Sequence, residues 1–595
     1  MQIANPPRGS EVRRIGLIIL ITFAAYLPVL RNGFIWDDDD HFTRNPAMTA
    51  RDGLRQIWST LAVSRYYPLT LTTFWAQRRL WGLNPAPYHV VNIILHAANA
   101  ALLFVLLCRL NVRGAWVAAA LWAVHPVNVE SVAWCTELKN TQSGLFFLLS
   151  LFCFLRFTDG SRPVWYAGSL FCCAAALLSK PSTVVLPLVV LLLAWWKNRC
   201  ITRMDMLRTA PFFVLAVATS LVTVAEQRAA IARGVQEWSL AWHERLAVAG
   251  AAIWFYAAKL VCPVNLAFVY PRWDLHSSLR LAPLVGVLVA IAALWRRRDR
   301  WVERTALFGV GYFVIALLPV LGWFDVYYFR YAFVADHFQY LASIGPLALV
   351  TAGVASVTRS RRVQQAVAAA VLAFFVALSA RRAATFHDNE TLWRETLRQN
   401  PRAFLAHNNL GRILAEQKGR YAEAVERFRE ALRLRPNFLE AHSNLGLALI
   451  RLGRLHEAVE QFQEALRLKP DDAVAHMGLG RAYQRLNRLD DAIGEYESAA
   501  RSDPHLTEAR VNLGVLLQQI GRPDDAIRAY RAALAIRPDD FAAHFNLGNA
   551  YLAQTNRAAA MEHYRSALAL ASTQGHADLM PQIQAQLKAL ERRIP

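Results

Sequence analysis

Residues 436–470 read PNFLEAHSNLGLALIRLGRLHEAVEQFQEALRLKP, and this stretch recurs along the C-terminal third of the chain. The prolines that mark it are spaced 35, 34, 34 and 34 residues apart: Pro401, Pro436, Pro470, Pro504 and Pro538. One glycine recurs in step with them: Gly411, Gly446, Gly480, Gly514 and Gly548. One aromatic residue does the same: Phe428, Phe462, Tyr496, Tyr530 and Tyr564. A fixed period of this length predicts a row of stacked helical units.

The period and its residue types are typical of tetratricopeptide (TPR) repeats, each of which is a pair of helices. Glycine lets two helices approach closely, the aromatic side chain fills the seam between them, and proline ends the second helix. We expect an α-solenoid over residues 385–574, made of a half-repeat around Trp393 and five full repeats. Residues 575–595 are expected to form a capping helix with a polar outer face.

The rest of the chain has the composition of a membrane protein. Of its 595 residues, 55% are hydrophobic and 18% are charged, and the mean hydropathy is +0.22. These values exclude a disordered chain and an ordinary soluble enzyme. The net charge is +21, but most basic residues lie in short runs between long apolar stretches, as in cytoplasmic membrane loops. We therefore expect a polytopic helical bundle over residues 1–384 and no nucleic-acid partner.

Eleven apolar segments are expected to cross the membrane. They begin near Ile15, Val90, Ala115, Thr141, Val164, Ser182, Pro211, Leu281, Thr305, Phe338 and Val363. The first has Arg8, Arg13 and Arg14 before it and lacks a small-residue cleavage site, which indicates an uncleaved anchor with a cytoplasmic N-terminus. The later basic runs, such as residues 296–298, then also face the cytoplasm.

This topology depends on residues 247–261. If that segment is re-entrant or interfacial, the loops at 31–89 and 226–280 and the C-terminal repeats all lie outside the cytoplasm. If it spans the membrane, every later loop changes side and the basic run at 296–298 falls outside. The first reading, together with the Arg- and Ala-rich composition, favours a bacterial inner membrane with periplasmic repeats.

The first extracytoplasmic loop opens with NGFIWDDDDHFTRNP, residues 32–46. Four consecutive carboxylates, Asp37 to Asp40, cost desolvation and mutual repulsion at a membrane interface unless water, cations or basic groups compensate them. Acids at this depth are functional candidates, and the alternative is a solvated acidic turn.

Further motifs carry a resemblance to a known family. They are RYYPLTLTTF at 65–74, YHVVNIILH at 88–96, HPVNVESVAW at 125–134, LLSKPS at 177–182, YPRWD at 270–274 and ADHFQYLASIG at 335–345. With downstream TPRs, the chain resembles the transmembrane and TPR-containing family of O-mannosyltransferases, in the GT-C glycosyltransferase superfamily. The resemblance implies that mannose is taken from a polyprenyl-phosphate carrier, with an undecaprenyl or a dolichyl chain.

The resemblance also implies site residues. Asp37 and Asp38 match the acidic pair of the catalytic first loop, although Asp39 and Asp40 extend it, so which carboxylate acts stays open. Glu130 matches the acid of the second loop, with His125 at the head of its motif. Relatives often have Tyr-Arg-Pro-Leu where this chain has Tyr66, Tyr67, Pro68 and Leu69, which leaves Arg65 as a substitute for the missing arginine.

Transfer from a phosphate-linked sugar to a hydroxyl needs a base and an electropositive group for the departing phosphate. Asp37 or Asp38 is the expected base. The expected phosphate-binding residues are Arg65, Lys180 and Arg272, and the alternative for each is to anchor a helix end by snorkelling. The expected supporting residues are His125, Tyr67 and His89. No set of metal ligands is predicted, although His125 and Glu130, or His41 and His89, are the donors that a divalent ion would use.

The repeats are expected to bind polypeptide in their concave groove. Two residues before four of the five glycines stands an asparagine: Asn409, Asn444, Asn512 and Asn546. An amide side chain can bond an extended peptide backbone without reading its side chains. A similar ladder lines the TPRs of the nucleocytoplasmic O-GlcNAc transferase, and the alternative is that asparagine merely belongs to the repeat consensus.

The leading hypothesis is an extracytoplasmic glycosyltransferase that transfers a mannose-like hexose from a polyprenyl-phosphate sugar to Ser or Thr of a protein held by the TPR groove. The alternative is a non-catalytic membrane-anchored TPR scaffold for envelope protein assembly. Eleven spans and an acidic interfacial loop exceed what an anchor needs. A transporter is less well supported, because few ionisable residues lie in the middle of the apolar segments.

Overall fold

The computed structural model describes residues 9–59, 67–160, 162–231, 240–275, 279–323, 327–357, 360–417, 419–572 and 574–591. Every regular element within these ranges is a helix, which confirms the all-α prediction. The chain divides into two compact units, Met1–Ala403 and Phe404–Pro595.

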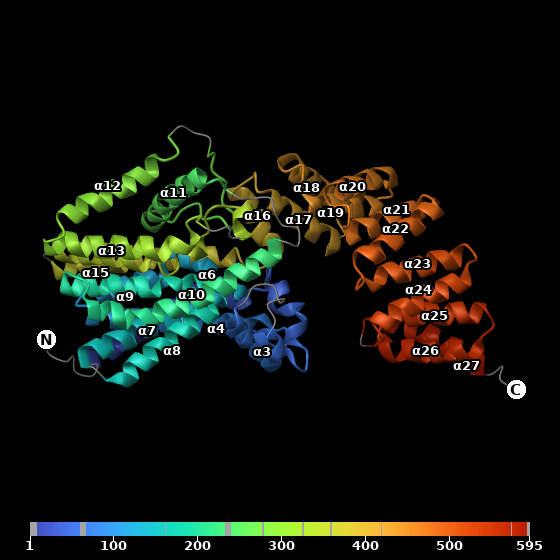
Figure 1. The fold of residues 1–595 in the computed structure, drawn as a ribbon, viewed down its shortest axis with the longest axis horizontal. Coiled ribbons are helices and arrows are strands. Elements are labelled where there is room, and N and C mark those ends of the chain that lie inside the picture. The colour runs from blue at the N-terminus through green and yellow to red at the C-terminus, as the bar shows by residue number, and fades with distance from the viewer. Residues whose placement is uncertain are drawn as a thin grey trace. The chain divides into compact units, whose positions relative to one another are not determined.

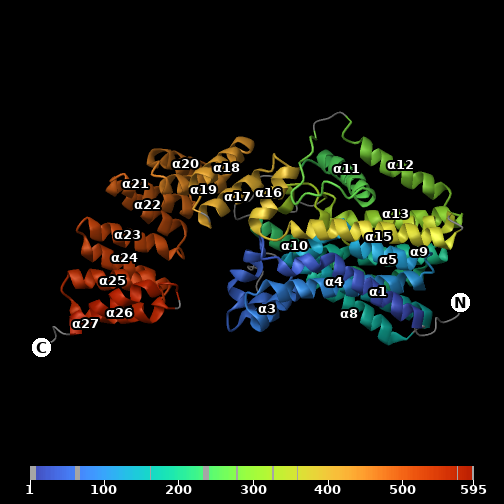
Figure 2. The same cartoon turned by 180° about the vertical axis from the view of Figure 1, so that it is seen from behind.

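The first unit is a set of apolar helices, many of which run side by side (Figures 1 and 2). Seven helical segments among the described residues are long and apolar enough to cross a membrane: Gly9–Arg31, Pro85–Arg109, Cys135–Gly160, Pro181–Asn198, Arg203–Glu226, Trp301–Val320 and Arg361–Ala384. They contain α1 (Gly9–Tyr26), α4 (Pro85–Arg109), α7 (Leu138–Gly160), α9 (Leu186–Asn198), α10 (Arg203–Ile231), α13 (Trp301–Leu317) and α15 (Arg361–Ala384). Four shorter apolar helices accompany them: α5 (Ala115–Val124), α8 (Pro163–Ser179), α12 (Ala282–Arg296) and α14 (Ile344–Val357).

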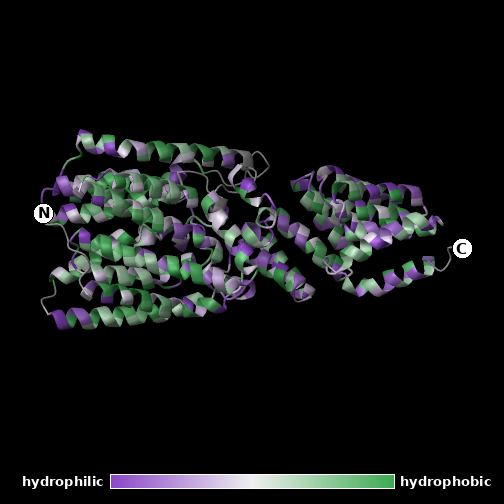
Figure 3. Ribbon diagram, turned by 90° about the horizontal axis from the view of Figure 1, so that it is seen from below, coloured by the Kyte–Doolittle hydropathy of each residue, from purple (hydrophilic) through white to green (hydrophobic). Residues whose placement is uncertain are grey.

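The helices of this unit consist mostly of hydrophobic residues (Figure 3). The side chains of Leu20, Phe171 and Leu221 are among the large hydrophobic groups that stay exposed. Helices that expose such side chains along their length require lipid around them, so the protein is integral to a membrane. The helix α11 (Trp242–Val261) has 20 residues and is not among the candidate spans.

Short helices carry the polar loops of the first unit. They are η1 (Leu27–Arg31), η2 (Asp39–Thr43), η3 (Pro46–Met48), α2 (Gly53–Ser59), α3 (Pro68–Trp81), η4 (Pro126–Asn128), α6 (Val129–Ala133), η5 (Cys135–Glu137), η6 (Pro181–Val185), η7 (Leu318–Val320), η8 (Tyr327–Arg330), η9 (Asp336–Gln339) and α16 (Asn389–Gln399). Figures 1 and 2 show α3 and α16 at the end of this unit away from the N-terminus. The helix α16, around Trp393, thus lies within the first compact unit.

The second unit consists of five helix pairs and a final helix. The elements are α17 (Phe404–Glu416), α18 (Tyr421–Leu434), α19 (Leu439–Arg451), α20 (Leu455–Leu468), α21 (Ala473–Arg485), α22 (Leu489–Ser502), α23 (Thr507–Gln519), α24 (Pro523–Ile536), α25 (Phe541–Ala553), α26 (Arg557–Ala571), η10 (Ala577–Leu579) and α27 (Met580–Glu591). The prediction of a helical repeat region is therefore confirmed. A Cβ atom added at Gly480 would stand 2.9 Å from the ring of Tyr496, so the repeated glycine is required by close helix approach. The last helix, α27, buries Ile583, Leu587 and Leu590.

Candidate functional site

Asp38 joins the acidic loop to the segment that leads into α7. Its buried carboxylate accepts hydrogen bonds from the Ile35 amide at 2.8 Å and from the amide and hydroxyl of Thr136 at 2.8 and 2.5 Å. Burial raises the pKa of Asp38 to about 8, although the hydrogen bonds from Ile35 and Thr136 oppose the rise. Because both oxygens accept bonds inside the protein, this carboxylate holds the loop in place.

Asp37 is the neighbouring acid, and its side chain is 12% exposed. The ring nitrogen Nδ1 of His41 donates to the backbone oxygen of Asp37 at 2.8 Å and lies 3.7 Å from its carboxylate. The ring of Tyr67 lies parallel to that of His41, with centroids 6.3 Å apart. Asp39 is more exposed and accepts a hydrogen bond from Thr43 at 2.6 Å. Asp37 therefore combines partial burial with some access to solvent.

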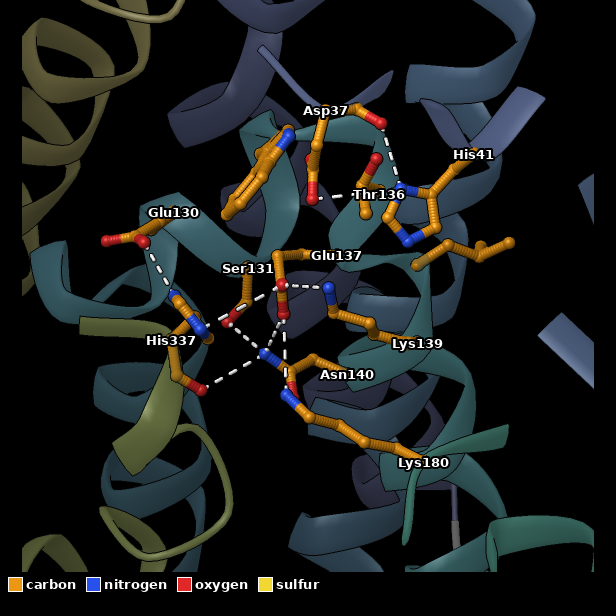
Figure 4. Close-up of polar contacts among 12 residues, drawn as sticks. Asp37, His41, Glu130, Ser131, Thr136, Glu137, Lys139, Asn140, Lys180 and His337 are labelled. Atoms are coloured by element: carbon orange, nitrogen blue, oxygen red, sulfur yellow. Dashed lines mark hydrogen bonds and ion pairs between the residues drawn. The ribbon is translucent and has the colours of Figure 1, made fainter. Parts of the chain in front are cut away.

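Glu137 lies at the centre of a buried polar cluster (Figure 4). Its carboxylate is 2.7 Å from the ammonium of Lys139, 3.5 Å from that of Lys180 and 4.0 Å from Nε2 of His337. Asn140 donates to the same carboxylate at 2.5 Å and accepts from Lys180 at 2.6 Å. Two lysines therefore share one fully buried carboxylate, which leaves the local charge positive.

Glu130 forms the other side of this cluster. Its oxygen Oε1 lies 2.6 Å from Nδ1 of His337, a residue 207 positions later. Burial raises the pKa of Glu130, and the charge of Asp336 adds to the rise. Burial also lowers the pKa of His337 to about 3. The imidazole of His337 is therefore uncharged near neutral pH, while burial favours the protonated form of Glu130.

Asp336, beside His337 on η9, ties two further segments to this helix. The hydroxyl of Tyr270 donates to its carboxylate at 2.8 Å, and the guanidinium of Arg382 lies 3.9 Å away. Burial raises the pKa of Asp336 to about 6, and the charge of Arg382 opposes the rise. The motifs at 270–274 and 335–345 thus meet at one carboxylate.

An aromatic group closes the cluster on the side of the acidic loop. The ring of Trp36 stacks on Trp134 with centroids 5.4 Å apart, and the ring of Trp393 meets Trp36 at 5.9 Å. The ammonium of Lys139 lies 5.4 Å from the Trp134 ring and 6.0 Å from the Tyr67 ring. Lys139 therefore faces both the Glu137 cluster and the aromatic side chains next to Asp37.

The structure brings some predicted residues together and places others apart. Lys180 belongs to the Glu137 cluster, and Tyr67 lies between His41 and Lys139. Arg272 is exposed, with its guanidinium 4.7 Å from the ring centroid of Phe333. Arg65 lies outside the described residues.

Two predicted histidines are fully buried in helix packing. The ring of His125 contacts the backbone oxygen of Leu260 at 3.1 Å and accepts from the amide of Val127 at 3.4 Å. Burial lowers its pKa to about 4, so it is neutral at physiological pH. The ring of His89 lies 3.5 Å from the sulfur of Cys135. Both rings help to fix the loops that carry Glu130 and Asp38.

Sequence reasoning missed Glu137, Lys139 and His337. The two charges of CTELKN stand at the start of an apolar segment, and ionisable groups at that depth are a functional signal. His337 lies inside the motif ADHFQYLASIG, but nothing in that motif indicates that its side chain contacts Glu130. These three residues would have completed the predicted site.

A small cavity adjoins the cluster. It has a volume of about 20 Å³ and is lined by Asn140, Lys180 and His337 among others. This volume holds about one water molecule, so a phosphate or a sugar can enter only if the lining side chains move. Among the residues that the structure describes, no three His, Cys, Asp or Glu side chains are grouped so as to hold a metal ion.

The repeat unit contains a larger groove, with a volume of about 1250 Å³. Asn444 and Asn512 line it, whereas Asn409 is buried and Asn546 lies in the fifth repeat. In the third repeat Gly478 stands in place of asparagine, because a side chain there would collide with the ring of Phe462. The predicted row of asparagines therefore reaches the groove at two positions, one in α19 and one in α23.

Two family profiles match the chain. Residues 68–225 match the profile described as dolichyl-phosphate-mannose-protein mannosyltransferase. Residues 377–437, 414–473, 443–507 and 511–575 match the tetratricopeptide repeat profile.

Curated relatives combine the same two parts. Protein O-mannosyl-transferase TMTC4 of Homo sapiens is 27% identical over 504 residues, which cover 70% of this chain and 65% of the relative. Protein O-mannosyl-transferase F38B6.6 of Caenorhabditis elegans is 25% identical, with coverage of 69% and 61%. The chain thus spans slightly less than two thirds of the length of these relatives.

Among solved structures, the crystal structure of YrrB, "a TPR protein with an unusual peptide-binding site", is 22% identical. The match covers 32% of this chain and 97% of that chain, with a TM-score of 0.26.

Proposed function

We propose, from the premise that the chain belongs to the TMTC-like protein O-mannosyltransferase family with its mannosyltransferase domain and TPR repeats, that it transfers mannose to a protein hydroxyl. The donor is a polyprenyl-phosphate mannose held in the membrane. The acceptor is a Ser or Thr side chain of a polypeptide gathered by the repeats.

The observation that carries this proposal is that acidic side chains and two lysines lie together in one polar cluster at the end of the membrane helices. Asp37 is the base, because it is the more buried of the two loop aspartates that are partly buried and keep some solvent access, with 12% of its side chain exposed against 35% for Asp39. Lys139 and Lys180, which both contact Glu137, supply the positive charge for a phosphate group. Asp38 and Glu130 act as positioning residues, because each is engaged by protein partners.

The reaction is a single displacement. Asp37 accepts the hydroxyl proton of the acceptor, the hydroxyl oxygen bonds to the anomeric carbon, and the bond from that carbon to the phosphate oxygen breaks. The electron pair leaves with the phosphate, whose charge Lys139 and Lys180 stabilise. One carboxylate acts as base, so the anomeric configuration inverts. Entry of the donor requires Lys180 to exchange its contact with Glu137 for the phosphate.

The proposed topology has eleven crossings, made of the seven long and four shorter apolar helices. The helix α11 then lies outside the bundle of spans, as a re-entrant or interfacial helix. Basic runs at the N-terminus and at residues 296–298 face the cytoplasm, whereas Asp37 and the repeats face the opposite side. A bacterial inner membrane with periplasmic repeats fits this arrangement, and Asn444 and Asn512 then bond the backbone of the acceptor.

The test compares envelope and secreted proteins from a deletion strain that carries wild-type protein, Asp37→Asn or Asp40→Asn. Intact-mass analysis should show a hexose-sized increment with the wild type and with Asp40→Asn, which makes the same chemical change at an exposed position. The increment should disappear with Asp37→Asn. Retention of the increment by Asp37→Asn would refute the assignment of the base, and its absence in every strain would favour the scaffold function.

A further inference from the structure

The groove of the repeat unit carries unbalanced positive charge. Four arginines line it, Arg412, Arg451, Arg481 and Arg485, together with the single carboxylate of Glu416. Arg412 pairs with Glu416 at 3.1 Å, and Arg481 pairs with Glu508. Arg451 and Arg485 are exposed, and no carboxylate among the described residues forms an ion pair with either of them. Arg485 donates one hydrogen bond to the backbone oxygen of Ile450, which leaves its charge unneutralised.

Other arginines of the repeats show that this is not a general property of the unit. Arg433 pairs with Glu430 at 2.6 Å, and Arg467 pairs with Glu464 at 2.8 Å, each on the second helix of its repeat. Neither residue lines the groove. Ion pairs three residues apart thus neutralise these helices, whereas the groove keeps two cations for a ligand.

The spacing of the two cations suggests the form of that ligand. Arg451 and Arg485 end the first helices of successive repeats, α19 and α21, which contact each other. Packed helices lie about 10 Å apart. A chain in the polyproline II conformation advances about 9 Å in three residues and returns its side chain to the same face. Two acidic side chains three positions apart therefore match the two guanidinium groups.

We propose that the groove binds an extended polypeptide segment with two carboxylate side chains three residues apart, read by Arg451 and Arg485. Asn444 lies in the same groove and can bond the backbone of the segment. A guanidinium donates two parallel hydrogen bonds to a carboxylate, which favours acidic side chains over their amides. The proposal rests on the proposed function only for the claim that this segment belongs to the acceptor.

The experiment measures binding of fluorescent peptides to the full-length protein in detergent by anisotropy. The peptides have about twelve residues, because about four repeats of roughly 10 Å divide into steps of about 3.3 Å. One peptide carries two Asp three positions apart in a Gly, Ser and Thr background, and its partner carries Asn at both positions. The Asp peptide should bind at least about tenfold more tightly, and this advantage should shrink at high salt.

Arg451→Gln with Arg485→Gln should remove that advantage. The matched control is Arg433→Gln with Arg467→Gln, which removes the same charge from the same unit and should leave the advantage unchanged. Circular dichroism checks that both variants keep their helices. Equal binding of the Asp and Asn peptides, or an undiminished Asp advantage in the groove variant, would overturn the proposal.

Asp37→Asn separates this proposal from the proposed function. That variant should bind the Asp peptide as tightly as the wild type while it transfers no sugar. Peptide binding without any transferase activity in the wild type would leave the groove assignment intact and remove the proposed function. If the wild type transfers sugar but binds the Asp and Asn peptides equally, the proposed function stands and the groove assignment is overturned.

Discussion

The backbone amide of Trp36 donates a hydrogen bond of 2.7 Å to Oδ1 of Asn389, a residue 353 positions later in the chain. Trp36 directly precedes the acidic loop and has a φ of +44°, a conformation that a non-glycine residue adopts only when its surroundings hold it there. Asn389 opens α16, so this helix fixes the backbone from which Asp37 projects.

Asn389→Ala should therefore lower the rate of transfer. Loss of one hydrogen bond at this position costs about 1 kcal/mol, which corresponds to a fall in kcat of about fivefold. Glu390→Gln, on the same helix, is the control. Steady-state kinetics with a soluble acceptor peptide should show the fall in kcat for the first variant alone. An unchanged kcat would show that α16 does not hold the acidic loop in its active position.

Glu137→Gln should strongly destabilise the membrane unit. It leaves Lys139 and Lys180 buried without their shared counter-charge, and breaking a buried ion pair costs about 3–5 kcal/mol. Glu395→Gln breaks the exposed pair with Arg398 and should cost at most about 1 kcal/mol. Thermal unfolding in detergent measures both, and similar midpoints would show that Glu137 is not the charge that holds the two lysines.

Asp38 should make stability depend on pH. Its pKa is raised to about 8 in the folded protein, against about 4 in the unfolded chain, so the folded state binds the additional proton between these values. The contribution of Asp38 to the free energy of unfolding is then fully present below about pH 4 and is lost as the pH rises towards 8.

The measurement is the unfolding midpoint from pH 5 to pH 8 in the wild type and in Asp38→Asn. The variant should be less stable overall, because an amide hydrogen must face Ile35 or Thr136, but its midpoint should decline less steeply with pH. Asp336 titrates in both proteins, so the comparison isolates Asp38. Parallel slopes would contradict the raised pKa.

Two glycines should respond in opposite ways to alanine. Gly480→Ala places a Cβ 2.9 Å from the ring of Tyr496 and should destabilise the repeats by about 1–3 kcal/mol. Gly494 lies on the exposed face of α22 with no atom within 4 Å of an added Cβ, so Gly494→Ala should stabilise that helix by up to about 1 kcal/mol. Limited proteolysis of the repeats reports both changes, and equal effects would argue against the packing explanation.

The native cysteines test the topology. Cys200 and Cys262 are both exposed, and the proposed orientation places the first in the cytoplasm and the second outside. A membrane-impermeant maleimide added to intact cells or spheroplasts should label Cys262 and spare Cys200 until the membrane is opened. The reverse pattern would put the acidic loop on the cytoplasmic side and end the proposed topology.

The repeats could be predicted from sequence because their information is local and periodic. Each glycine and its aromatic partner lie on the two helices of one repeat, so the spacing of Gly480 and Tyr496 recurs along the chain. The acidic loop was visible for a similar reason, since four adjacent carboxylates after an apolar segment stand out by composition alone.

The rest of the site depends on contacts between distant segments. His337 meets Glu130 across 207 positions, and Lys180 meets Glu137 across two helices, so no local pattern announces either pair. Lys180 was predicted from sequence to bind the donor phosphate, but the sequence did not indicate that its ammonium lies beside a buried carboxylate. When two opposite charges come from distant segments, neither segment shows a local pattern that predicts their ion pair.

Each repeat packs mainly on its neighbours, so a 34-residue unit can be gained or lost without disturbing the helices that surround Glu137. Such a change lengthens or shortens the groove by about 10 Å. On the proposed function, duplication or deletion of repeats changes which proteins the groove can hold, while the catalytic cluster passes unchanged from ancestor to descendant.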